Sequence, residues 1–452
     1  MDDHDNPSGV EGKGEGGAID SVPLVYRPGH KLRQASQAIV DRKKLSEVYA
    51  GRESALQVNS EGAEGRQRHD PSLHEGAPPN LFTGPSFRNP RERYRMDGHK
   101  LMYHLDRVLA WQNGERIAPI HIDMGLTKFC NTACIYCYAV VQNMSRGTMI
   151  ARDALLGFIR DCGAIGVRSV GFIGDGEPTL NPALYDATVL AGQVGVDTGM
   201  ATNGLALDMS RAEELLENMS FIRFNLSAGT AKGFTRVHQS AGQNFDLLKE
   251  KIGELVQRKR RGGHSCTIGL QMVLIPECFS EILAEAELGA KLGVDYLVIK
   301  QCADSEYKEL GVDYGDYGQA QELLRQAEAM STPDYLVQVK WSKINAATET
   351  NLYRNGIRKY DICYGTPFLS QISGNGRVYP CGPFYNKERF FMGDIHTQSF
   401  KEIVQGDHYW SVHRDIAESV DVHKDCAIGC RQDYINKFLW DLKMPPEHVN
   451  FI

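Results

Sequence analysis

The chain has 452 residues, a formal net charge of −7 and a hydrophobic fraction of 42%. This length exceeds that of one ordinary domain and predicts two or three domains. The negative charge argues against a nucleic-acid binder driven by bulk charge. No apolar run reaches the roughly 18 residues that a membrane-spanning helix needs, so we expect no membrane partner.

The start of the chain, Met1 to Asp5, has neither a basic segment nor an apolar one, so we expect no secretory signal. A chain without such a signal is expected in the cytoplasm. Thiols stay reduced there, and the 11 cysteines therefore favour metal binding or redox chemistry over disulfides.

Residues 1–90 are rich in Gly, Ser, Asp, Glu and Pro, and we expect a mostly disordered polar extension. One amphipathic helix is predicted near residues 32–48. A lead-in segment follows over residues 91–117, because apolar side chains recur at helical spacing over residues 99–113.

Strand and helix patterns alternate six times within residues 118–335. The predicted strands cover residues 119–124, 168–173, 196–201, 221–226, 267–274 and 295–300. The predicted helices cover residues 151–162, 182–191, 211–218, 245–259, 279–292 and 317–330. Such alternation predicts parallel strands joined by helical crossovers. We expect the α/β class and a partial (β/α)6 barrel, whose site lies at the C-terminal ends of its strands.

Residues 336–452 have a different composition, in which glycines, aromatic residues and cysteines alternate within short segments. We expect a small irregular α+β domain that depends on a metal centre more than on a large core.

Three cysteines follow the first predicted strand with gaps of three and two residues: Cys130, Cys134 and Cys137. This spacing suits three corners of an iron–sulfur cube and leaves its fourth iron without a protein ligand. Zinc with a distant fourth ligand also fits the spacing alone.

This stretch, with Tyr136 before its last cysteine, resembles the signature C-x3-C-x2-C of the radical SAM superfamily. Further segments resemble that family's motifs in the same order on successive strands: 174–178, 202–204, 223–227 and 268–271. The resemblance covers about residues 118–335. Asp175 departs from it, because the family's turn is usually Gly-Gly-Glu-Pro.

The resemblance implies a [4Fe–4S] cluster whose open iron binds S-adenosylmethionine. A reductant such as flavodoxin or ferredoxin would supply an electron. The reduced cluster would then split the sulfonium and yield a 5′-deoxyadenosyl radical that removes a hydrogen atom from the substrate.

The resemblance also implies cofactor-binding roles for five residues. Glu177 would accept a hydrogen bond from the amino group of S-adenosylmethionine, and Gly176 would let the backbone approach closely. Asn203 and Ser227 would bind ribose hydroxyls or the carboxylate, which Arg223 would also contact. A purely structural role is the alternative for the other four residues, Glu177, Asn203, Ser227 and Arg223.

The C-terminal region contains four further cysteines, and its C-x12-G-x4-C opening resembles SPASM and twitch domains. The four are Cys363, Cys381, Cys426 and Cys430. They would fully ligate one auxiliary [4Fe–4S] cluster, which fits a twitch-like domain because a complete SPASM domain binds two. A structural zinc ion on four thiolates is the alternative.

Lys300, after the sixth predicted strand, and Asp123, on the first, are the candidate catalytic acid–base groups. His121 shares the face of Asp123, since strand side chains alternate. The alternative is that these residues form a polar layer of the barrel whose hydrogen bonds are all made within the protein.

Segments 100–107, 223–230 and 294–300 resemble radical SAM enzymes of sugar and aminoglycoside assembly, such as diol dehydratases and aminocyclitol dehydrogenases. This resemblance implies a small carbohydrate-like substrate in antibiotic or natural-product biosynthesis, modified by 1,2-diol dehydration or by dehydrogenation. Two alternatives remain open: a maturase that crosslinks or epimerises a ribosomal peptide, and a zinc-stabilised binding protein without catalysis.

Overall fold

A computed structural model describes Tyr94 and residues 98–137, 147–304, 310–348, 358–426 and 430–451. Residues Arg88–Ile452 form one compact unit. The predicted polar extension over residues 1–90, with its helix near residues 32–48, lies outside the described residues.

One sheet runs through this unit in the strand order β10–β9–β8–β1–β2–β3–β4–β5–β6–β7. Its strands are β1 His121–Met124, β2 Ser169–Phe172, β3 Asp197–Thr202, β4 Met219–Asn225, β5 Thr267–Leu274, β6 Tyr296–Gln301, β7 Leu336–Val339, β8 Leu369–Ile372, β9 Arg377–Tyr379 and β10 Gly393–Asp394. All pairs from β8 through β1 to β7 are parallel. The six predicted strands and the α/β class with an unclosed parallel barrel are confirmed.

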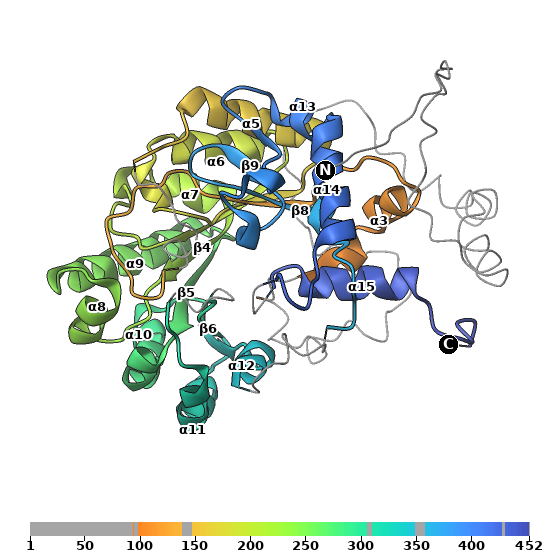
Figure 1. The fold of residues 1–452 in the computed structure, drawn as a ribbon. Coiled ribbons are helices and arrows are strands. Elements are labelled where there is room, and N and C mark those ends of the chain that lie inside the picture. Colours follow the sequence, from red (N-terminus) through yellow and green to blue (C-terminus); the bar gives the residue numbers. More distant parts are fainter. Residues whose placement is uncertain are drawn as a thin grey trace, which may run out of the picture. The chain divides into compact units, whose positions relative to one another are not determined.

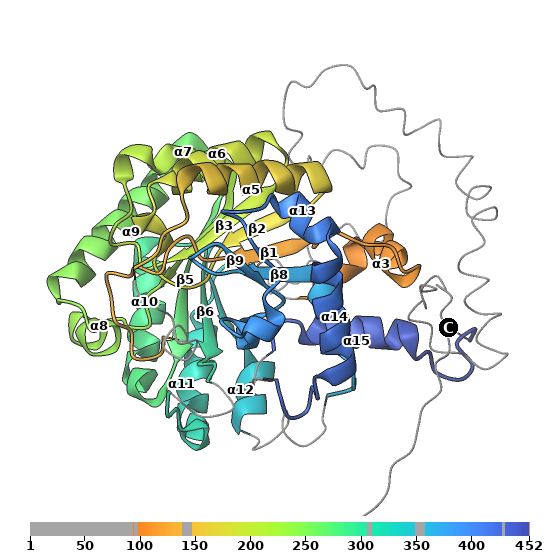
Figure 2. The ribbon, with the colours of Figure 1, turned by 45° about the horizontal axis from the view of Figure 1, so that its top comes forward.

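Helices follow the strands along the chain and most lie on the outer side of the curved sheet (Figures 1 and 2). Their bounds are α5 Arg152–Ile165, α6 Ala183–Gln193, α7 Ala212–Asn218, α8 Ala231–His238, α9 Gln243–Gly262, α10 Ile282–Leu292, α11 Tyr317–Ala329 and α12 Trp341–Thr348. Helix α3, Leu105–Gln112, precedes β1. Six of these helices match the predicted ones, whereas α8 was not predicted. The predicted helix over residues 99–113 is divided into a 3-10 helix, Gly98–Tyr103, and α3.

Side-chain alternation along the strands separates an apolar outer face from a polar interior face. Ile222 on β4 and Ile299 on β6 are buried in the core beneath the helices. Their neighbours Arg223 and Lys300 therefore point to the opposite face, inside the barrel. Apolar packing against the helices stabilises the barrel, and the interior face is left to carry charged groups.

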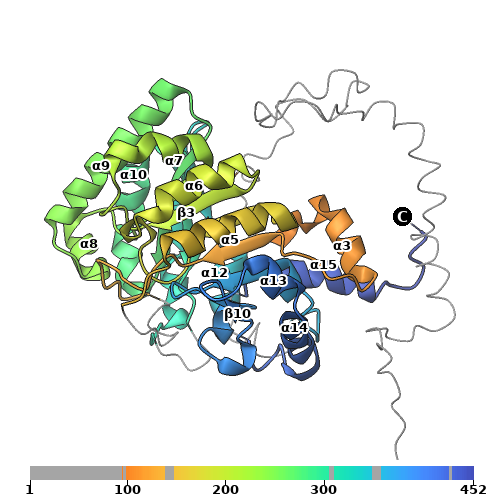
Figure 3. The ribbon, with the colours of Figure 1, turned by 90° about the horizontal axis from the view of Figure 1, so that it is seen from above.

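The C-terminal segment contributes directly to the barrel sheet. Strand β8 pairs in parallel with β1, β9 pairs antiparallel with β8, and β10 pairs antiparallel with β9. Helices α13 Phe400–Gln405, α14 Asp407–Ser419 and α15 Asp433–Lys443 complete this segment. Helix α13 lies beside α5 (Figure 3). Phe400 of α13 packs edge-on against Phe158 of α5, with ring centroids 5.0 Å apart. The domain boundaries after residues 90, 117 and 335 stay predictions.

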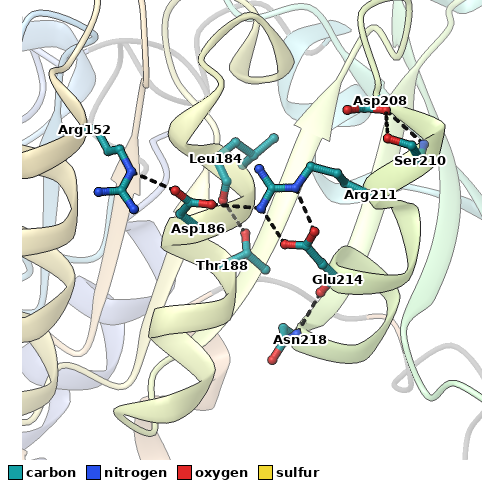
Figure 4. A network of polar contacts seen from close by, with 9 residues as sticks. All are labelled: Arg152, Leu184, Asp186, Thr188, Asp208, Ser210, Arg211, Glu214 and Asn218. Carbon is teal, nitrogen blue, oxygen red and sulfur yellow. Dashed lines mark hydrogen bonds and ion pairs between the residues drawn. The ribbon is translucent and has the colours of Figure 1, made fainter.

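A polar network on the outer side joins the beginnings of three helices (Figure 4). Asp186 on α6 accepts hydrogen bonds from Arg152 and Arg211, each 2.8 Å long, and Arg211 also pairs with Glu214 on α7. These two arginines lower the pKa of the Asp186 carboxyl. All four side chains are at least partly exposed, so each pair is worth about 0–1 kcal/mol and serves mainly to align helices. Among the described residues, none of the helices has the length and apolar character to cross a membrane.

Candidate cofactor site and auxiliary cysteines

The three clustered cysteines lie on the loop that follows β1, at the C-terminal edge of the parallel strands. The Thr132 hydroxyl lies 3.4 Å from Cys130 Sγ and 3.5 Å from Cys134 Sγ, so two of the thiols converge on one side chain. The charges of Cys130 and Cys137 both act on Cys134. The loop therefore gathers three thiols, as a shared cluster requires.

Burial raises the pKa of the Cys134 thiol to about 12, so this thiol is neutral at pH 7 until a metal displaces its proton. His238, at the end of α8, places its Nδ1 3.1 Å from Cys134 Sγ. The loop is also held by α8 through its backbone, since Ala133 N and Ile135 N donate to His238 O and Val237 O. The helix that the sequence did not predict thus positions the cysteine loop.

The turn Gly174–Pro178 after β2 packs directly against this loop. Gly176 has φ +72°, and a Cβ there would lie 2.0 Å from the carbonyl oxygen of Thr127. Glu177 N donates to the carbonyl oxygen of Phe129 over 2.8 Å. Only glycine fits the required conformation and the close approach, so Gly176 lets the turn and the cysteine loop meet.

The Glu177 carboxylate is 2% exposed and already engaged on both oxygens. Oε1 accepts hydrogen bonds from Thr179 N and Oγ1 and from Thr202 Oγ1, and Oε2 accepts one from Asn203 N over 2.7 Å. Glu177 therefore ties its own turn to the end of β3. Its predicted bond to the amino group of S-adenosylmethionine stays a prediction.

Asn203 joins this assembly through its side chain, because Nδ2 donates to Asn131 Oδ1 over 2.6 Å. Ser227 has φ +48°, and its Oγ accepts a hydrogen bond from Val273 N over 2.9 Å. Arg223 lies four residues earlier on β4, deeper inside the barrel. The predicted contacts of all three residues with S-adenosylmethionine stay predictions.

Asp175, the residue that departs from the family turn, joins the turn to the C-terminal segment. It is 2% exposed, and its oxygens accept hydrogen bonds from Ser373 Oγ and Gly374 N, each 2.7 Å long. Gly374 is packed so tightly that a Cβ would lie 2.4 Å from the carbonyl group of Thr127. A side chain absent from the usual motif therefore docks the β8–β9 turn on the candidate cofactor site.

Asp175→Ala should lower the free energy of unfolding by about 1–3 kcal/mol, because it strands two buried donors. Asp175→Asn is the matched control, since its amide oxygen still accepts from Gly374 N and Ser373 Oγ can accept from its amide. Denaturant unfolding under anaerobic conditions measures the difference. Equal stability of the alanine and asparagine variants would show that these two bonds do not hold the turn.

An ion pair joins the buried Asp123, on the interior face of the barrel, to Arg431 of the C-terminal segment, whose side chain is 44% exposed. Arg431, directly after Cys430, places Nε 2.5 Å from Asp123 Oδ2 and its NH2 group 2.9 Å from Oδ1. His121 Nε2 lies 3.0 Å from the same carboxylate, and His121 Nδ1 lies 2.7 Å from Ser169 Oγ. Although burial opposes the charge, Arg431 and His121 lower the pKa of Asp123. Asp123 is therefore a weak proton acceptor, and its predicted catalytic role stays a prediction.

Lys300 lies on the same interior face, at the end of β6. Burial and the nearby cations Arg223, Lys343 and Arg431 lower the pKa of Lys300 to about 7. A group with this pKa can give or take a proton near neutral pH.

The four C-terminal cysteines act on one another electrostatically. Burial is the largest cause of the raised pKa of Cys381, and the charges of Cys426, Cys363 and Cys430 raise it further. Burial likewise raises the pKa of Cys363 to about 11. Arg358 contributes positive charge beside these thiols and stabilises their ionised form.

Among the described residues, no three His, Cys, Asp or Glu side chains converge as they would around one metal ion. The two cysteine sets are therefore assigned from their spacing along the chain and from the charges by which their members act on one another. Cys130, Cys134 and Cys137 would hold the first cluster, and Cys363, Cys381, Cys426 and Cys430 the second.

Three residues with functional contacts were missed from the sequence. His238 lies on the unpredicted helix α8, far along the chain from Cys134. Arg431 follows a predicted cluster ligand directly, but nothing in the sequence indicates that it reaches Asp123. Glu285 on α10 is fully buried, and burial raises its pKa to about 8. Its position beneath the residues that follow β4 depends on tertiary packing.

Two family models match the chain. Residues 124–297 match the radical SAM superfamily, and residues 363–431 match SPASM, described as an iron–sulfur cluster-binding domain. The second match contains all four C-terminal cysteines, from Cys363 at its first residue to Cys430 near its end.

Curated relatives are distant. The tungsten-containing aldehyde ferredoxin oxidoreductase cofactor-modifying protein of Pyrococcus furiosus is 27% identical over 184 residues, which cover 40% of this chain and 50% of that protein. The AdoMet-dependent heme synthase of Methanosarcina barkeri is 24% identical over 333 residues, which cover 70% of this chain and 91% of that protein. The chain thus matches half the length of the first relative and most of the second.

Among solved structures, SuiB of Streptococcus suis bound to its precursor peptide SuiA superposes with a TM-score of 0.57 at 14% identity, covering 88% of this chain and 85% of SuiB. The S-adenosylmethionine complex of SuiB gives a TM-score of 0.53 at 15% identity, covering 73% and 77%. At these identities the likeness shows a shared fold. The predicted [4Fe–4S] clusters and S-adenosylmethionine agree with the two matched domains. This chain carries a radical SAM domain over residues 124–297, followed by a SPASM iron–sulfur domain over residues 363–431.

Proposed function

We propose that the chain is an enzyme that cleaves S-adenosylmethionine reductively and oxidises a substrate bound inside the barrel. A [4Fe–4S] cluster on Cys130, Cys134 and Cys137 supplies the electron for that cleavage when it is bound. The observation that carries this proposal is the direct bonding of the cysteine loop to the Gly174–Pro178 turn and to Asn203. These three segments bear the motifs of the family, and they meet at one edge of the sheet.

Glu177 acts in this proposal as a positioning residue rather than as a ligand. Its carboxylate holds the end of β3 against the turn through Thr202 and Asn203. The backbone of the turn and the Asn203 side chain are then fixed before the cofactor arrives, and pre-organisation lowers the entropy cost of binding it.

Lys300 is the better candidate for the proton-transfer step. Its pKa of about 7 lets it accept a proton from the substrate and release it again at neutral pH. Asp123, by contrast, is held by Arg431, which favours its ionised and weakly basic form.

The auxiliary cysteines support net oxidation. Four thiols can ligate every iron of a second cluster, so this cluster would hold no substrate and would accept an electron instead. Cys363 and Cys381 flank β8, the strand that pairs with β1, and Arg431 connects the same segment to Asp123. The second cluster would therefore be held against the barrel by direct sheet pairing.

The substrate we favour is a precursor of an organic cofactor. Both curated relatives described above are named for cofactor synthesis or cofactor modification. A precursor peptide is the second candidate, because the SuiB structure with the same fold contains one. The predicted carbohydrate-like substrate finds no counterpart among these relatives. A cationic aminoglycoside would also meet repulsion from Arg223, Lys300, Lys343 and Arg431 inside the barrel.

Anaerobic reconstitution with iron and sulfide, followed by S-adenosylmethionine and dithionite or reduced flavodoxin, tests the proposal. We expect 5′-deoxyadenosine, measured by liquid chromatography and mass spectrometry, and iron with sulfide in the protein. Zinc without iron, or no cofactor cleavage with either reductant, would contradict the proposal and favour a zinc-stabilised binding protein.

A further inference from the structure

The interior of the barrel gathers more positive than negative charge. Arg223 on β4 and Lys300 on β6 both point inside, because their strand neighbours are buried in the outer core. The charges of Lys343, from α12, and Arg431, from the C-terminal segment, also act on Lys300. Asp123 is the carboxylate that acts on Arg223 among these described groups.

Asp123, the carboxylate that acts on Arg223, is already engaged by other groups. Asp123 binds Arg431 through both of its oxygens and also contacts His121. Lys300, in contrast, makes no hydrogen bond or ion pair with any described residue, although three cations surround it. The Lys300 side chain is partly exposed inside the barrel, so an anion from outside the chain can reach this uncompensated charge.

Arg223 also has an incomplete polar group within the described part of the chain, because its Nε is buried without a hydrogen-bond acceptor. Guanidinium groups bind carboxylates and phosphates through paired N–H donors, which suits an acceptor-rich ligand beside Arg223. This unfilled donor lies on the same interior face as the uncompensated Lys300.

We infer that the substrate bears an anionic group, a carboxylate or a phosphate, which binds inside the barrel between Lys300 and Arg223. This inference rests on the proposed function, and it narrows the substrate to acids and excludes cationic amino sugars. The anion would compensate the charge of Lys300, which then stays protonated and can act only as a proton donor, and it would give Arg223 Nε the acceptor that it lacks. It would also place the rest of the substrate toward the cysteine loop, because both strands end at that edge.

Binding of small probes to the reconstituted enzyme tests the inference by titration calorimetry. The probes are glutarate and inorganic phosphate as anions, glutaramide as the neutral analogue, and 1,5-diaminopentane as the cationic one. We expect at least one anion to bind, and the preferred one identifies carboxylate or phosphate as the recognised group. Binding by the diamine, or by none of the four probes, would overturn the inference.

Variants at Lys300 locate the anion. Lys300→Gln should weaken binding of the preferred anion at least about tenfold, the loss of one charged hydrogen bond, whereas Lys300→Arg should retain it. Arg223→Gln should also weaken binding of that anion. If either glutamine variant binds the anion as the unchanged enzyme does, the proposed position is wrong.

The pH dependence provides a second readout. The free Lys300 has a pKa of about 7, which burial, Arg223, Lys343 and Arg431 lower and Cys302 raises. Since the anion binds the charged form, its affinity should fall about tenfold between pH 6 and pH 8. Lys300→Arg should abolish this fall, whereas the same fall in the arginine variant would contradict the assignment. Formation of 5′-deoxyadenosine by the unchanged enzyme is measured separately, so a failure of the proposed function is distinguishable from a failure of anion binding.

Discussion

Cys134→Ala should reduce cleavage of S-adenosylmethionine more than about 100-fold, because loss of a ligand costs more than the 10–100-fold loss seen on removing an outer-shell partner. Cys134 lies in the middle of the cysteine loop, between two other candidate ligands, and contacts His238. The rate of 5′-deoxyadenosine formation, measured together with bound iron and sulfide, checks this result.

The matched control is Cys162→Ala, which removes a fully buried cysteine on α5 that takes no part in either cysteine set. This variant should keep both its iron and its cleavage activity. The assignment of the first cluster would be contradicted if Cys134→Ala kept the iron content and rate of the control.

Arg431→Met should lower the free energy of unfolding by about 3 kcal/mol, the cost of leaving a buried charge without its partner. The Asp123 side chain is 6% exposed and would retain only His121. The double variant Asp123→Asn with Arg431→Met should recover part of the loss, because it removes the stranded charge. Denaturant unfolding of the reconstituted protein measures all three variants.

Arg389→Met is the control for this pair, since Arg389 pairs with Asp415, whose side chain is 34% exposed, whereas that of Asp123 is 6% exposed. Its loss should cost less than about 1 kcal/mol. Arg431 lowers the pKa of Asp123. The ion pair therefore adds its full contribution to the free energy of unfolding above about pH 4, the ordinary pKa of an aspartate, and this contribution is lost as the pH falls further. The penalty in Arg431→Met should therefore shrink below pH 4, and a penalty independent of pH would show that the ion pair is not its cause.

The strand and helix periodicity was sufficient to predict the barrel. Strand β5 matches its predicted bounds, and the other five predicted strands differ from β1, β2, β3, β4 and β6 by a few residues at their ends. These segments are recognisable because apolar residues recur with the period of their own element. Helix α8 was missed because it is short and follows β4 with only a few apolar residues.

The pairing of β8 with β1 could not be predicted, because it joins segments far apart along the chain. The short β8 has no distinctive pattern, and its partner is chosen by tertiary packing. The same holds for Arg431 with Asp123 and for Asp175 with Ser373. In each case one member was noticed in the sequence, Asp123 as a polar strand residue and Asp175 as a departure from the motif. Their partners follow from the fold alone.

The candidate ligands, by contrast, were predictable, because cysteine spacing on one loop is a local property. Cys130, Cys134 and Cys137 lie together as predicted from their gaps, and the four C-terminal cysteines influence one another's pKa. The charge of the barrel interior was not predictable. The chain carries a net charge of −7, whereas the charges of Arg223, Lys343 and Arg431, which the sequence places on separate segments, all act on Lys300.

Mössbauer spectroscopy of enzyme reconstituted with enriched iron, before and after addition of S-adenosylmethionine, tests most directly whether one iron beside Cys130, Cys134 and Cys137 lacks a protein ligand. A variant with Cys363, Cys381, Cys426 and Cys430 replaced by alanine leaves only the signal of this centre. We predict that S-adenosylmethionine shifts the signal of a single iron of the cluster toward higher coordination. Spectra that do not change on addition, or a centre without sulfide, would contradict the account.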